Sequence, residues 1–156
     1  MCRTSYASSS LGGLLDATLP LSASTRTTAG ILLLTIVFIE YGGTYILRIV
    51  RGGESLTKFQ EAFARAGHGH AGVLVILALV CQILVDGAAL DGVLGFLARN
   101  GITAAAILMP AGFFFSSAGS GATEPNRFIL LVYAGAVSLA LGVTSLGFGL
   151  LTAQVR

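Results

Sequence analysis

Four long apolar stretches, separated by short polar connections, dominate the pattern of hydrophobic and polar positions along this chain. They cover about residues 29–50, 66–86, 101–118 and 126–152. At about 1.5 Å per residue, a helix of about 20 residues crosses the hydrocarbon core of a bilayer. Continuous apolar runs favour helices over a transmembrane β-barrel, whose strands alternate apolar and polar residues. The pattern therefore predicts an all-α membrane protein, with a bundle of four transmembrane helices over residues 29–156.

Two of the connections carry apolar residues at helical spacing and are predicted to form short interfacial helices. In the first, residues 52–65, Leu56, Phe59 and Phe63 fall at i, i+3 and i+7 while the charges lie elsewhere. This spacing is typical of an amphipathic helix at the membrane surface, and an extension of the second span into water is the alternative. The second connection, residues 86–100, has leucine and valine in a similar spacing.

The first 28 residues are predicted to form a flexible or interface-lying tail. They are rich in Ser, Thr, Ala and Leu, and the leucines at positions 11, 14 and 15 would line one face of a short surface helix before Pro20. A cleaved signal peptide needs a longer uninterrupted apolar core, so we expect no cleavage. An arm that packs on a partner subunit is the alternative.

Composition supports the membrane class and excludes several functions. Only 10% of the residues are charged, against about 25% in a typical soluble domain. The net charge of +2 is small and scattered, which excludes nucleic acid as a partner. Cys2 and Cys81 do not form a pattern typical of a disulfide framework. The chain has no nucleophile–base set, phosphate-binding loop or CxxC pair, so we do not expect an enzyme.

Glu40, His68 and His70 are the candidate chemical groups. Glu40 lies near the midpoint of the first span, where a carboxylate costs about 2.5–3.5 kcal/mol and should face protein or water rather than lipid. Gly43 shares its helical face and would let a neighbouring helix approach. Both histidines precede the second apolar run, which is only about 22 Å long as a helix. The helix must therefore include the histidines if it is to span the bilayer.

One carboxylate and two imidazoles form a ligand set for a transition metal, and also a possible proton relay. On a regular helix His68 and His70 point about 200° apart, so both can bind one ion only if the flanking glycines loosen the helix. His70 is expected to be the histidine that points inward. No other span carries a histidine, so a haem would have to be shared with a partner subunit. The alternative is that these groups satisfy only structural hydrogen bonds.

The fourth span carries a row of small residues on one face. Its members are Ala134, Ser138, Gly142, Ser145 and Gly149. Such rows let membrane helices approach closely. The row predicts close packing within the bundle, or a contact in a homo-oligomer or with a partner subunit.

Two short motifs carry a resemblance. Residues 67–74 (GHGHAGVL) and 123–126 (TEPN) are similar to motifs of small four-helix membrane proteins from high-GC bacteria that carry no assigned activity. The resemblance implies a multi-pass protein of a bacterial inner membrane and no particular chemistry.

The orientation and the function follow as hypotheses. Four spans place both termini on one side, and the basic cluster from Arg48 to Arg65 favours the cytoplasm for the opposite side. The leading hypothesis is a non-enzymatic membrane protein that works by association, as an accessory subunit of a larger complex or as a homo-oligomer. The alternatives are a metal- or haem-binding protein that uses Glu40, His68 and His70, and a small proton or ion conductor centred on Glu40.

Overall fold

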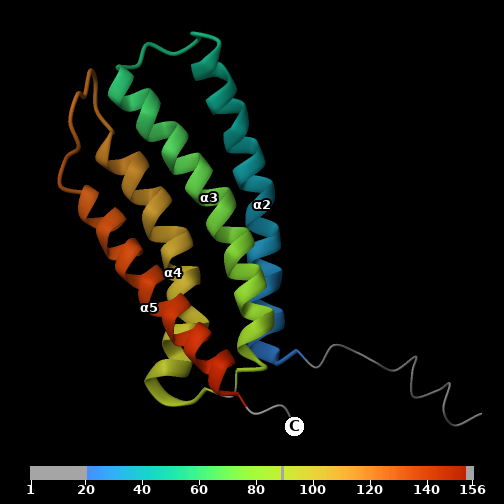
Figure 1. Ribbon diagram of the computed structural model, residues 1–156. Coiled ribbons are helices and arrows are strands. Elements are labelled where there is room, and N and C mark those ends of the chain that lie inside the picture. Colours follow the sequence, from blue (N-terminus) through green and yellow to red (C-terminus); the bar gives the residue numbers. More distant parts are fainter. Residues whose placement is uncertain (1–20, 89, 154–156) are drawn as a thin grey trace, which may run out of the picture.

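Four long helices make up the computed structural model, which describes residues 21–88 and 90–153 (Figure 1). They are α2 (Ala23–Val50), α3 (Lys58–Val85), α4 (Gly92–Ser116) and α5 (Ile129–Thr152). Each helix is long and apolar enough to cross a membrane. The prediction of an all-α bundle of four transmembrane helices is confirmed, and the chain is a small polytopic membrane protein. Residues 1–20, with most of the predicted tail, lie outside the described residues.

α2 and α3 begin at capping residues rather than at the edges of the apolar runs. α2 begins at Ala23, inside the predicted tail, because the Ser22 side chain accepts a hydrogen bond from the Thr25 N–H at 3.2 Å. α3 begins at Lys58, after a capping box in which the side chains of Thr57 and Gln60 bond reciprocally to each other's backbone N–H. Capping thus extends both helices into polar sequence.

The prediction of two separate interfacial helices is wrong. Residues 58–65 form the first turns of α3, which is the alternative of an extended second span. The amphipathic spacing is real, but no proline separates it from the apolar run that follows, and Gly67 and Gly69 stay within the helix. Residues 92–100 likewise form the first turns of α4, which continues through Asn100 and Gly101. The connection at this end shrinks to the short segment between Val85 and Gly92.

The helices run up and down, so that both described ends of the chain lie at the same end of the bundle (Figure 1). α4 packs most closely against α5 and also against α3, whereas α2 packs mainly against α3. Only Thr25, Leu32 and Ile49 are buried on α2. α2 is therefore the peripheral helix, with most of its surface free to meet lipid or another protein.

Glycines bring α4 and α5 together. A Cβ added to Gly101 would lie 2.8 Å from the Ser138 carbonyl oxygen, and one added to Gly142 would lie 3.0 Å from the Ile102 backbone nitrogen. The Ser138 hydroxyl donates a hydrogen bond to the Gly101 carbonyl at 2.8 Å. Approach this close is the usual role of small residues between membrane helices.

The small-residue row of the fourth span lies largely at this contact. Ser138 and Gly142 face α4, Ser145 is buried, and a Cβ on Gly149 would clash with Leu90. Ala134 is exposed, and its neighbour, the buried Gly135, lies against α4 instead. The row is therefore used inside the bundle.

Candidate functional site

His68 lies at the crossing of α2 and α3, against two consecutive glycines of α2. A Cβ added to Gly43 would lie 3.6 Å from His68 Nε2, and one added to Gly42 would lie 3.8 Å from His68 Nδ1. These are ordinary van der Waals distances, so the glycines let the imidazole rest against the α2 backbone. The ring is half-buried. His68, rather than His70, is the histidine that faces α2.

His70 points to a different side of α3. Its Nδ1 lies 2.7 Å from the Ala66 carbonyl oxygen, and its ring packs 4.9 Å from that of Phe113. A carbonyl only accepts, so Nδ1 carries the proton and Nε2 is left to interact elsewhere. His70 lines an open surface hollow of about 350 Å³ together with Arg65, Ala66, Gly69 and Val73. The two histidines diverge, as side chains two positions apart must on a regular helix.

Glu40 is exposed on α2, and no residue in the described ranges forms a hydrogen bond or ion pair with it. Its expected position, facing other residues of the bundle, is not found within this one chain. α2 packs mainly against α3, and Glu40 is not covered by that contact. Within the described part of the chain, no three His, Cys, Asp or Glu residues are grouped closely enough to hold a metal ion. Glu40, His68 and His70 are thus not assembled into one ligand set, and a metal or haem shared with a partner stays a prediction.

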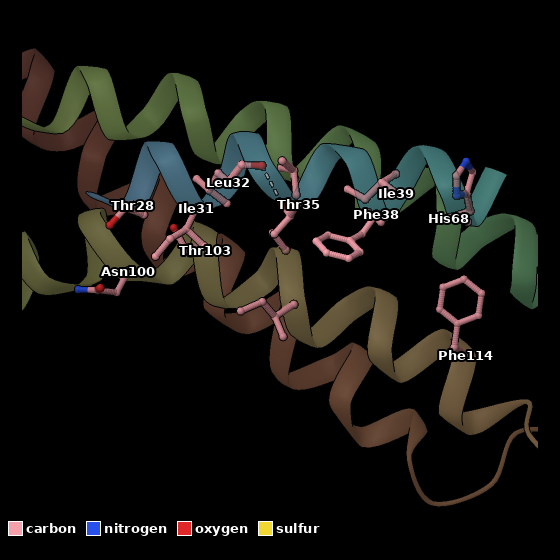
Figure 2. Close-up of a pocket in the computed structure, with 15 residues that line it drawn as sticks. Thr28, Ile31, Leu32, Thr35, Phe38, Ile39, His68, Asn100, Thr103 and Phe114 are labelled. Carbon is pink, nitrogen blue, oxygen red and sulfur yellow. Dashed lines mark hydrogen bonds between the residues drawn. The ribbon is translucent and has the colours of Figure 1, made fainter. Parts of the chain in front are cut away.

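A long apolar groove of about 510 Å³ opens between α2 and α4, with α3 as its floor (Figure 2). His68 and Phe114 lie towards one end, and Thr28 and Asn100 lie towards the other (Figure 2). Apolar side chains of α2 and α4 line most of the space between them. The groove offers no charged group, so its chemistry suits an apolar chain rather than a reacting substrate.

A polar cluster joins three helices at the end of the bundle that holds the described termini. Asp86 accepts hydrogen bonds from the Ser22 N–H at 2.9 Å and from Arg99 Nη2 at 2.9 Å. Arg99 Nη1 donates to Thr25 Oγ1, which donates to the Gln82 carbonyl. Burial disfavours the charged carboxylate, but the bonds from Ser22, Arg99 and Thr25 outweigh it and lower the pKa of Asp86 to about 2. The cluster fastens the start of α2 to α3 and α4.

The sequence pattern did not single out this cluster. Asp86 and Arg99 lie 13 positions apart in the sequence, and residues so separated meet only when the chain reverses between them. The usable signal was an acidic and a basic residue at opposite ends of one predicted connection, residues 86–100.

Comparisons with protein families, with curated proteins and with solved structures found no match for this chain.

Proposed function

We propose that this chain is a non-enzymatic membrane protein that works by association, as a homo-oligomer or as an accessory subunit of a larger complex. The observation that carries the proposal is Glu40, an exposed carboxylate near the middle of a membrane-spanning helix. Exposure at this depth, without a partner in the described chain, means exposure to lipid unless another protein covers it.

Glu40 makes the exposed surface of α2 costly to leave in contact with lipid. An ionised side chain at the centre of a bilayer costs on the order of 2.5–3.5 kcal/mol on insertion scales. A contact that supplies a hydrogen-bond donor to Glu40 would remove most of this cost. The neighbouring apolar side chains on α2 are also well exposed, with Val37 at 67% and Leu47 at 46%. α2 thus combines an unsatisfied polar group with apolar area, as the buried centre of a membrane interface requires.

The small residues of α5 do not offer a comparable surface. Gly135, Gly142 and Gly149 are buried within the bundle, where a Cβ would meet other residues of the same chain. Association through that row would require α4 and α5 to separate. The proposal therefore places the association surface on α2.

The resemblance of the GHGHAGVL and TEPN segments supports a bacterial inner membrane as the location. The basic residues at the end of the bundle that joins α2 to α3 support a cytoplasmic position for that end. Both termini would then lie on the non-cytoplasmic side.

Mass measurement of the purified protein tests the proposal. The full chain is purified in mild detergent, and native mass spectrometry compares the particle with the 16.0 kDa monomer. We expect a multiple of the chain mass, or a stoichiometric complex with another membrane protein, and we expect Glu40→Leu to weaken it. Glu124→Gln, which removes an exposed carboxylate from the connection between α4 and α5, serves as the matched control. A strictly monomeric wild-type particle with no bound protein would overturn the proposal.

A further inference from the structure

Glu40 and the hollow around His70 lie on the same side of the α2–α3 pair. On α2, the groove-lining residues Phe38 and Gly42 are each two positions from Glu40, which is about 200° around the helix. On α3, the hollow-lining residues Gly69 and Val73 are likewise two positions from the groove-lining Ala71. Both features are therefore turned away from the groove, towards the outside of the bundle.

The two features also lie at nearly the same depth. The contact of His68 with Gly42 and Gly43 sets the register of the two antiparallel helices. From this contact, Glu40 lies two to three residues back along α2, and His70 lies two residues forward along α3. Because the helices are antiparallel, both displacements run in the same direction, by about 3–5 Å. Two copies in one membrane share an orientation, so only groups at equal depth can meet.

The chemistry of the two features is complementary. His70 Nδ1 donates to the Ala66 carbonyl, so Nε2 is free to accept a proton or to share one. A carboxyl group opposite Nε2 forms one short hydrogen bond whether the proton lies on oxygen or on nitrogen. Arg65, which is exposed at the rim of the same hollow, adds a second donor. Glu40 supplies an acidic group, and His70 and Arg65 supply basic groups that can bond to it.

We infer that the back of the α2–α3 pair is a two-fold interface with a second copy of this chain, in which Glu40 of each protomer bonds to His70 of the other. A two-fold axis along the membrane normal keeps depth unchanged and makes the same pair twice, as an isologous contact requires. A Cβ added to Gly69 or Gly72 would have no neighbouring atom within 4 Å, so the α3 backbone is open to close approach by a partner helix. The inference rests on the proposed function and names its partner.

Cysteine cross-linking tests the interface directly. Two differently tagged full-length chains, both carrying Cys2→Ser and Cys81→Ala, are co-expressed and oxidised in membranes. One carries Glu40→Cys and the other carries His70→Cys. We expect a disulfide between the two tags. The matched control replaces Glu40→Cys with Phe38→Cys, on the groove side of the same helix, and should give no comparable product.

A second pair of variants keeps the test independent of the polar groups. Gly69→Leu places a side chain in the hollow, where no atom of the monomer lies within 4 Å of the added Cβ, so the fold should survive while the dimer is lost. Gly147→Leu on α5 is equally open and should leave the dimer intact. Glu40→Gln should weaken dimerisation about tenfold or more, because it leaves His70 without its acid partner.

The outcomes separate this inference from the broader proposal. An oligomer that gives no 40–70 disulfide and tolerates Gly69→Leu overturns this interface but leaves association standing. A single chain bound to a different subunit supports an accessory role and also overturns the two-fold contact. A lone monomer overturns both.

Discussion

Replacing Asp86 with asparagine should loosen the end of the bundle where α2, α3 and α4 meet. The carboxylate accepts from the Ser22 backbone and from Arg99, and Arg99 also reaches Thr25. The amide keeps the shape of the side chain but removes the charge. Arg99 then loses its ion-pair partner while its guanidinium stays largely covered, with 28% of the side chain exposed.

The size of the stability loss follows from the lowered pKa of Asp86, because protonation and folding are linked. The pKa of Asp86 is lowered from 3.8 to about 2 in the folded protein. A shift of this size corresponds to about 2 kcal/mol of stability at neutral pH, and screening by water at the end of the bundle reduces it to about 1–2 kcal/mol. For a chain of this length, such a loss lowers the Tm by about 2–8 °C.

Thermal unfolding in mild detergent at pH 7, followed by circular dichroism, measures this loss. Asp91→Asn is the matched control, because Asp91 is exposed and its side chain makes no capping bond to α4. A double-mutant cycle with Arg99→Gln isolates the pair: the combined variant should lose less than the sum of the single losses. Equal Tm values for Asp86→Asn, Asp91→Asn and the wild type would refute the reasoning.

The same linkage gives a pH dependence with a defined sign. Because the folded-state pKa of Asp86 lies below its usual value, its contribution is complete above about pH 4 and declines as the pH falls towards 2. The difference in Tm between wild type and Asp86→Asn should therefore shrink over this window. A difference that grows on acidification would contradict the assigned bonds.

Three further predictions concern packing, capping and orientation. Gly112→Leu should destabilise the bundle by several kcal/mol in thermal unfolding, because its Cβ would lie 2.6 Å from the Val132 backbone nitrogen, whereas Gly147→Leu meets open space and should be neutral. Thr57→Ala removes the cap of α3 and its bond to the Ala122 carbonyl, and should cost about 1–2 kcal/mol by the same assay. A C-terminal alkaline phosphatase fusion should be active and a C-terminal green fluorescent protein fusion dark, because the C-terminus is placed outside the cytoplasm; the reverse result would invert the orientation.

The helices were predictable because their signal is local. A span needs only enough consecutive apolar residues to cross the bilayer, and this requirement is visible without knowing any contact. The even number of spans then places both ends of the chain together. Whether residues 58–65 form a separate surface helix or the start of a span was not predictable in the same way. The amphipathic residues 58–65 are compatible with either, and the absence of a break before Ala66 decided for one continuous helix.

The site was predictable in its members and not in its arrangement. Glu40, His68 and His70 are conspicuous as polar groups in apolar sequence, and the divergence of the two histidines follows from helical geometry. Which histidine faces α2 depends on the rotation of α3 about its own axis. That rotation is set by contacts with α4, such as the approach of Gly67 to Phe113 and Phe114.

Glu40, the most unusual residue of the first span, shows most clearly what the sequence alone did not determine. Length and hydropathy alone place a carboxylate near the middle of a transmembrane helix, and its charge alone requires a partner there. Neither property shows that α2 packs mainly against one helix and leaves this carboxylate on the outside, which became visible only in the folded bundle. The physical reason is that the covered side of a helix is settled by long-range packing, where glycines draw α4 to α5 and leave α2 at the edge.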